Sequence, residues 1–156
     1  MYMLGSYIVA HYSGIPYANF VEERIFKPLS MSSTTVWPSV AINSGKLSDS
    51  WSKDGRRVPY WFHDDMVAMK AGAGGVISSA EDSVKWLAVW LNKGVDPVTN
   101  ATIFPESVYD AATTGHWIAR GTGGGTSDSY GASIVGYGMG WQRWSYGTVD
   151  VRIPHS

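Results

Sequence analysis

The segment from Ser13 to Thr34 constrains the fold of this chain more than any other, because it contains a helix stop followed by a second helix. Gly14 suits the left-handed position that follows a helix, and Pro16 suits the first turn of the next one. Apolar residues then recur at helical spacing until Pro28, which ends the run. The sequence therefore predicts two short helices separated by a tight turn.

Composition limits the class of protein. The 156 residues, 44 % of them apolar, suffice for one domain or a substantial piece of one. A net charge of −1 gives no reason to expect nucleic acid as a partner. No apolar run approaches the roughly 20 residues of a membrane span. The absence of Cys excludes disulfides and thiolate metal sites, while eight Trp and nine Tyr suit either a packed core or a ligand cleft.

Periodicity and turn signals predict the remaining elements. We expect helices over Tyr2–Tyr12, residues 81–91 and residues 105–113, the first with Leu4, Tyr7 and Ile8 on one face and the second with a stripe of Val84, Leu87, Ala88 and Leu91. We expect loops over residues 36–69, with strand pieces 46–51 and 58–62 around Asp54-Gly55, and a Gly-rich loop over residues 115–133. Strands are expected over residues 137–144 and 148–153.

Three blocks of the chain match one family pattern in order and spacing. The first consists of Gly14, Tyr17, Phe20, Ile25, Phe26, Pro28, Leu29 and Met31, the second of Ala73, Gly74, Gly75, Ser78, Ala80 and Asp82, and the third is Tyr-Gly-x-Gly-Trp at 137–141. Across residues 2–37, 71–92 and 137–156 the chain thus resembles the serine β-lactamase-like hydrolases. This family includes class C β-lactamases, D-alanyl-D-alanine carboxypeptidases and related esterases.

The resemblance implies an α+β protein: part of a β-lactamase/transpeptidase-like fold, mainly the helical lobe plus a C-terminal antiparallel β-hairpin. We expect one partial domain over residues 1–156, with helices and loops up to residue 136 and strands of the antiparallel sheet over 137–156. The family acts through a Ser-x-x-Lys pair, a Tyr-x-Asn element and a Lys-Thr-Gly or His-x-Gly strand. The first two elements are expected upstream of Met1, with the tyrosine element ending just before it.

The same resemblance assigns the candidate site residues. His155 and Ser156 would form a His-Ser-Gly element with a following Gly, and the resemblance then implies for them a catalytic role in substrate alignment. Gly74 and Gly75 are expected to border the substrate cleft. Class C β-lactamases carry a Tyr at the place of Gly74, so its absence disfavours β-lactamase activity, and Gly72 stands where the family usually has Pro. No cofactor is implied, and the partner is a small-molecule or peptide substrate.

Several other motifs match catalytic or binding patterns only in their letters. Tyr17-Ala18-Asn19 reads as Tyr-x-Asn and residues 50–53 as Ser-x-x-Lys, but their order along the chain is the reverse of the family's. His63-Asp64-Asp65 is expected in a surface loop, since adjacent residues rarely converge on one metal ion. Residues 121–126 lack the Lys-Ser/Thr of a phosphate loop.

The sequence thus predicts a fragment of a serine hydrolase that acts through an acyl-enzyme on an ester, amide or peptide substrate and is inactive alone. The alternative is a non-catalytic ligand-binding or scaffolding protein of the same fold. The sequon at residues 100–102 is compatible with secretion, although it leaves the compartment open.

Overall fold

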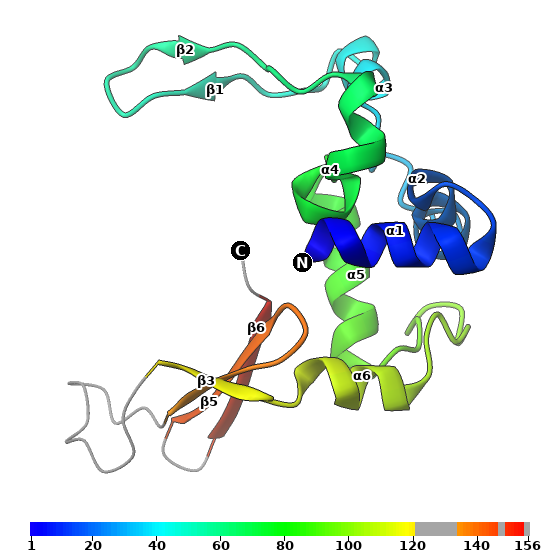
Figure 1. Ribbon diagram of the computed structural model, residues 1–156, viewed down its shortest axis with the longest axis vertical. Helices are drawn as coiled ribbons and strands as arrows, with labels where there is room; N and C mark the ends of the chain where they lie inside the picture. The colour runs from blue at the N-terminus through cyan, green and yellow to red at the C-terminus, as the bar shows by residue number, and fades with distance from the viewer. Residues whose placement is uncertain (121–133, 147–148, 155–156) are drawn as a thin grey trace. The chain divides into compact units, whose positions relative to one another are not determined.

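The structure, a computed structural model, describes residues 1–120, 134–146 and 149–154 (Figure 1). The chain forms two compact units, Met1–Ala88 and Val89–Ser156, and the boundary falls inside helix α5. The first unit contains α1 (Tyr2–Ser13), α2 (Tyr17–Val21), a π-helix (Glu22–Phe26), α3 (Pro38–Asn43), β1 (Ser50–Trp51), β2 (Arg57–Val58), a 3-10 helix (Asp64–Met66) and α4 (Val67–Gly74). The remaining elements are α5 (Ala80–Leu91), α6 (Glu106–Thr113), β3 (Trp117–Arg120), β4 (Val135–Tyr137), β5 (Trp141–Tyr146) and β6 (Val149–Pro154).

The predicted helix pair at residues 13–34 is confirmed. Helix α1 ends at Gly14, whose φ of 73° is left-handed and whose N–H donates to the Ala10 carbonyl over 3.1 Å. Pro16 then precedes α2. The second helix does not stay α-helical, because Lys27 N–H donates five residues back to the Glu22 carbonyl over 2.9 Å.

Three residues of the first matched block lie in the core of the first unit, together with buried residues outside the pattern. Phe26, Leu29 and Met31 are all buried, and Val36 is only 1 % exposed. Because Pro28 ends the helical run between them, the chain turns here and brings these apolar side chains into one interior. The first block therefore contributes to the packing of this unit.

Helix α1 packs against α4 through small side chains. Ser6 is the buried residue of α1, while the predicted apolar face is exposed at Leu4, Tyr7 and Ile8. A Cβ added to Gly72 of α4 would stand 2.4 Å from the Ser6 Cβ. The two helices therefore meet where neither has a large side chain.

The second unit contains an antiparallel sheet, which in the described residues has four strands in the order β3-β4-β5-β6. The β5–β6 hairpin is regular, with Trp141 opposite Pro154 at one end and Tyr146 opposite Val149 at the other. The predicted α+β class and antiparallel hairpin are confirmed. The sheet starts earlier than residue 137, because β3 and β4 pair across the Gly-rich stretch. The division at residue 136 and the single partial domain stay predictions.

The Tyr-Gly-x-Gly-Trp block forms a turn between β4 and β5 rather than one strand. Gly140 has a φ of 81°, and the Gly138 N–H donates to the Trp141 carbonyl over 2.8 Å. A Cβ on Gly138 would stand 2.3 Å from the Ala112 carbonyl oxygen at the end of α6. Glycine is therefore required for the sheet to pack on α6, which explains the motif.

Aromatic rings fill the interior of the second unit around Trp90. Its ring centroid lies 4.7 Å from that of Phe104 and 4.6 Å from that of Trp141. From β6, Arg152 Nη1 donates to the Tyr109 hydroxyl over 3.1 Å and to Thr113 Oγ1 over 3.0 Å. The last matched residue of the third block, Trp141, therefore packs directly on α5.

The stretch over residues 36–69 is more ordered than expected. Strands β1 and β2 flank Asp54-Gly55 as expected, but they cover only Ser50–Trp51 and Arg57–Val58 rather than the predicted pieces 46–51 and 58–62. Helices α3 and α4 occupy sequence without strong periodicity: Pro38 takes the first turn of α3, and the composition of α4 is small and apolar. Among the described residues no helix has the length and apolarity to cross a bilayer.

The Ser6–Gly72 contact predicts opposite effects for two glycines of one helix. Gly72→Ala should lower the free energy of unfolding by about 1–3 kcal/mol, because the new methyl group overlaps Ser6. Gly74→Ala, in the same helix, meets nothing within 4 Å and should be neutral or stabilising, since Ala favours helix. Urea unfolding of both variants measures this, and equal effects would contradict the close approach.

Candidate functional site

The candidate catalytic residues His155 and Ser156 lie outside the described residues. The described strand that leads to them, β6, is at the end of the sheet order and pairs with β5 alone in this part of the chain. Pro154 stands opposite Trp141, so the predicted hairpin between the third block and the terminal pair is present. The roles of His155 and Ser156 stay predictions.

The two candidate cleft glycines have different surroundings. Gly74 ends α4, is exposed, and would meet nothing within 4 Å if it carried a Cβ. Gly75 is buried, and a Cβ there would stand 2.7 Å from the Ala71 Cα and 3.4 Å from a ring carbon of Phe62. Gly75 is therefore required for packing, whereas the position of Gly74 has room for a side chain or a ligand.

The first turn of α1 lies beside the end of α4. A Cβ on Gly72 would stand 3.0 Å from the Tyr2 carbonyl oxygen, in addition to its overlap with Ser6. Figure 1 shows the start of α1 next to α4, in agreement with this contact. The structure thus places the Tyr2 backbone against Gly72, which stands two residues before Gly74 in α4.

Lys70 of α4 lies against two aromatic rings from the segment that precedes this helix. Lys70 Nζ stands 3.8 Å from the centre of the Trp61 ring and 5.9 Å from that of Phe62. Trp61 is 61 % exposed, while Phe62 is buried beneath Gly75. Lys70 is four residues before Gly74 and so lies on the same face of α4. Sequence reasoning missed Trp61 and Lys70, for which the run Tyr60-Trp61-Phe62 was the available signal.

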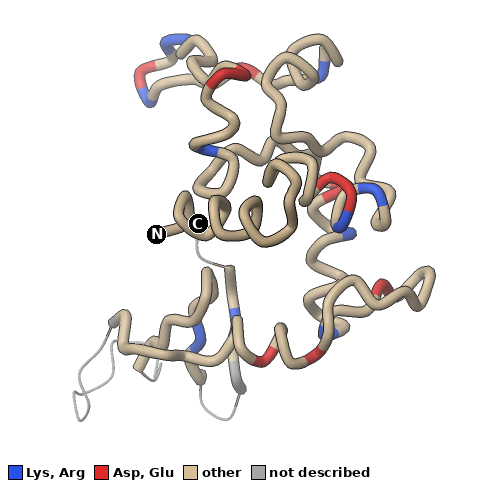
Figure 2. The backbone as a smooth tube through the Cα atoms, turned by 45° about the vertical axis from the view of Figure 1, so that its right-hand side comes forward, with Lys and Arg blue, Asp and Glu red and all other residues tan. Residues whose placement is uncertain are grey.

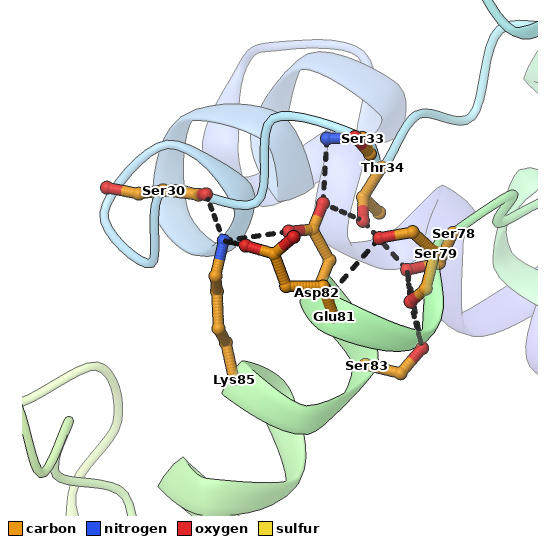
Figure 3. Close-up of polar contacts among 9 residues, drawn as sticks. All are labelled: Ser30, Ser33, Thr34, Ser78, Ser79, Glu81, Asp82, Ser83 and Lys85. Carbon is orange, nitrogen blue, oxygen red and sulfur yellow. Dashed lines mark hydrogen bonds and ion pairs between the residues drawn. The ribbon is translucent and has the colours of Figure 1, made fainter. Parts of the chain in front are cut away.

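A buried carboxylate, that of Asp82, joins the loop at residues 33–34 to the first turn of α5. Asp82, in the first turn of α5, is 1 % exposed. Its Oδ2 accepts from the Ser33 N–H over 2.7 Å and from Thr34 Oγ1 over 2.9 Å, and its Oδ1 accepts from Lys85 Nζ over 2.9 Å. Figure 3 shows the three donors converging on the one carboxylate. The buried charge is therefore both paired and hydrogen-bonded.

The pKa of Asp82 reflects this environment. Burial by itself would raise the pKa, but the hydrogen bonds from Lys85, Thr34 and the Ser33 N–H outweigh it and hold the pKa below its usual value of 3.8. The same contact with Asp82 raises the pKa of Lys85. Both groups therefore stay charged at neutral pH.

Hydroxyl groups extend the network to the segment that follows Gly75. Thr34 Oγ1 lies 2.8 Å from Ser78 Oγ, and Ser79 Oγ accepts from the Asp82 N–H over 3.2 Å. Thr35 and Ile77 exchange two backbone hydrogen bonds, of 2.9 and 2.8 Å. The segment from Gly75 to Ser79 is thus fixed to the loop before α3 and to α5 at once.

The motifs that match catalytic or metal-binding patterns only in their letters lie in helix α2, in the β1–β2 hairpin and before α4. Tyr17 lies in α2, where burial raises its pKa, and residues 50–53 lie on the β1–β2 hairpin, where Ser50 and Lys53 are exposed. Asp64 accepts from the Ser39 hydroxyl and N–H at the start of α3, which lowers its pKa. Within the described residues no group of three metal-ligating side chains occurs. Residues 121–126 lie outside the description.

Charged residues are distributed without a long stretch of one sign. Figure 2 shows basic and acidic positions interspersed along the described backbone. Besides the Asp82 pair, the described residues form exposed ion pairs such as Lys93–Glu106 at 2.7 Å and Arg57–Asp49 at 2.7 Å. Such pairs contribute little to stability. The expectation that nucleic acid is not a partner stays a prediction.

Comparison with known proteins agrees with this architecture. A family model described as Beta-lactamase matches residues 1–153. The chain therefore belongs to the β-lactamase family, whose known members include hydrolases, and the predicted family is confirmed. None of the curated protein sequences matches the chain.

Solved structures share the fold at low sequence identity. The octameric penicillin-binding protein homologue from Pyrococcus abyssi is 18 % identical with a TM-score of 0.67, and the match covers 97 % of this chain and 30 % of that one. For a β-lactamase/D-alanine carboxypeptidase from Pseudomonas syringae the values are 16 %, 0.61, 91 % and 33 %. For the D-amino acid amidase from Ochrobactrum anthropi SV3 complexed with D-phenylalanine they are 22 %, 0.64, 99 % and 42 %. The chain spans less than half the length of each.

The Asp82 contacts predict an acid-dependent loss of stability. Asp82→Asn should lower the free energy of unfolding at pH 7 by about 2–4 kcal/mol, since it leaves Lys85 without its buried partner. Because the folded pKa is lowered, the wild-type advantage is present above 3.8, the ordinary Asp value, and is lost as the pH falls further. Urea unfolding at several pH values measures the difference between the two proteins.

The matched control is Glu81→Gln, which removes the neighbouring charge from the same helix turn. Glu81 is 84 % exposed and lies 3.5 Å from Lys85, so its loss should cost less than about 1 kcal/mol. Equal effects of the two substitutions, or an Asp82→Asn deficit that persists unchanged in acid, would contradict the structural role of the carboxylate.

Proposed function

We propose that this chain is part of a serine hydrolase that forms an acyl-enzyme on an ester, amide or peptide substrate, and that the 156 residues alone are inactive. The nucleophilic Ser-x-x-Lys pair and the tyrosine element would come from polypeptide outside these residues. Membership of the β-lactamase family supports the reaction type. The chain matches less than half of each solved relative, which supports the idea that the other catalytic residues lie in polypeptide outside these 156 residues.

The contact between α1 and the end of α4 carries this proposal. The family pattern puts the tyrosine element directly before Met1, and the Tyr2 backbone lies against Gly72. A tyrosine delivered by the preceding residues would therefore stand close to Gly74, the candidate edge of the cleft. Proton transfer and substrate binding would then occur side by side, as general acid–base catalysis requires.

The surroundings of Gly74 bear on the substrate class. The open space where class C β-lactamases carry a Tyr suits a substrate with a bulky group, so an ester, amide or peptide is favoured over a β-lactam. Lys70, held over Trp61 on the same helix face, would offer a cation to a substrate carboxylate or carbonyl oxygen. His155 and Ser156, which follow strand β6, would align the substrate from the sheet.

Exposed apolar side chains support the presence of further polypeptide in the active protein. On α1, Tyr7 is 69 % exposed and Leu4 is 53 % exposed. On α5, the predicted apolar stripe is exposed as well, with Val84 at 64 % and Leu91 at 88 %. Contiguous apolar surface of this kind normally packs against protein.

The alternative is a non-catalytic ligand-binding or scaffolding protein of the same fold. The exposed Trp61 and the adjacent Lys70 favour it, because an aromatic ring and a cation can bind a ligand without a nucleophile. The two proposals differ in the upstream coding sequence, where only the hydrolase requires Ser-x-x-Lys followed by Tyr-x-Asn, and a Gly after Ser156.

The first test compares the purified chain with a longer polypeptide that includes the flanking coding sequence. With a chromogenic ester or cephalosporin we expect no turnover by the 156 residues and acyl-enzyme formation by the longer form, detected by intact mass. Hydrolysis by the short chain that Ser50→Ala abolishes would overturn the proposal. Intact upstream motifs without acylation, or replaced motifs, would support the binding alternative.

The second test concerns substrate alignment. In the longer polypeptide, His155→Ala should lower kcat/KM by about 10²–10³-fold, the usual effect of removing a group that stabilises the transition state. Tyr17→Phe and Ser50→Ala serve as controls and should leave the rate unchanged. An unchanged rate in His155→Ala would remove the third element from the proposal.

A further inference from the structure

One sequence motif has no part in the proposed hydrolase site. The chain contains four Asn residues, and only Asn100 is followed two positions later by a hydroxyl residue, Thr102, with Ala101 between them. Asn19, Asn43 and Asn92 are followed at that position by Val, Gly and Gly. Asn-x-Ser/Thr is the acceptor pattern for N-linked glycosylation of surface loops. The chain thus has one such acceptor pattern.

The loop that carries Asn100 holds its shape without the Asn100 side chain. Val95 bridges to Thr102, the Asp96 N–H donates to the Ala101 carbonyl over 2.9 Å, and the Asn100 N–H donates to the Asp96 carbonyl over 2.9 Å. The Asp96 carboxylate accepts from the Val98 N–H over 3.0 Å and from the Thr99 hydroxyl. A modification on the Asn100 carboxamide would therefore disturb none of these contacts.

Asn100 and Thr102 are both exposed, in the loop that joins α5 to α6 (Figure 1). The backbone of Asn100 is left-handed, with a φ of 58°, which Asn tolerates better than most residues. This geometry explains why Asn or Gly is suited to position 100. It does not require a hydroxyl group at position 102, where the side chain makes no hydrogen bond in the described part of the chain.

We propose that Asn100 is an N-glycosylation site, modified when the protein passes through a eukaryotic secretory pathway. The co-reactant is a lipid-pyrophosphate-linked oligosaccharide. The Asn100 carboxamide nitrogen forms a bond to C1 of the first sugar, the bond from C1 to the pyrophosphate oxygen breaks, the lipid pyrophosphate leaves, and the amide gives up one proton. The glycan would also lie beside Val98, an apolar side chain that is 86 % exposed on the same loop.

The test uses the full chain secreted by yeast and recovered from the medium, so that every molecule has crossed the secretory membrane. We expect one gel-mobility shift, which peptide N-glycosidase removes from the native protein because the site is exposed. In heavy-oxygen water this cleavage should convert Asn100 alone to labelled Asp, as read by peptide mass. A wild-type chain without the shift, or a glycan elsewhere, would overturn the proposal.

Matched variants separate glycosylation from a purely conformational role of Asn100. Thr102→Ser should keep the shift, whereas Thr102→Val retains Asn100 and the shape of the side chain but should lose it. Asn100→Gly keeps the left-handed backbone and should lose the shift without a fall in the thermal unfolding temperature of the deglycosylated protein. A shift that persists in Thr102→Val would contradict the proposal.

Discussion

The buried carboxylate of Asp82 is the interaction on which the first unit most depends. A charge that is 1 % exposed is tolerated only when donors surround it, and its donors come from three places: the Ser33 backbone, the Thr34 hydroxyl and Lys85. Satisfying this single group therefore fixes the loop after Met31 against the start of α5. The Thr35–Ile77 bridge then holds the segment that follows the candidate cleft glycines. Hydrogen bonds between residues far apart in the sequence therefore hold the loop after Met31, the segment after Gly75 and the start of α5 together.

Elements with local signals were predictable from the sequence. The stop at Gly14 and the Asp54-Gly55 turn are specified by residues adjacent to them. Helix α4 and strand β3 were not predictable. Helix α4 depends on contact of Gly72 with Ser6, which lies 66 positions earlier in the chain (72 − 6), and β3 pairs with β4 across the Gly-rich stretch. Intrinsic propensity is weak in both, so the tertiary partner decides the structure.

The candidate site divides in the same way. The role of Asp82 as an acidic first-turn residue was visible, but two of its partners, Thr34 and Ser33, are 48 and 49 positions away and no periodicity connects them to it. The pairing of Trp61 with Lys70 likewise depends on how the chain enters α4. Apolar periodicity was misleading for α1 and α5, where it marks exposed faces, since the buried positions are Ser6 on α1 and Asp82 and Val89 on α5. An apolar stripe along a helix indicates a surface that packs against something, but it does not identify the element that covers it.

The absence of side chains at Gly72 and Gly74 determines how helix α4 ends. A Pro at position 72 would remove a backbone N–H and interrupt α4 before its last turn. Gly72 instead allows α4 to continue to Gly74 and allows α1 to approach to the distance that Ser6 permits. Gly74 then ends the helix with no side chain over the adjacent surface, so Lys70 and Trp61 stay accessible beside it. The physical consequence is open space at Gly74 on the helix that also carries Lys70, at the position where the family resemblance gives class C β-lactamases a tyrosine.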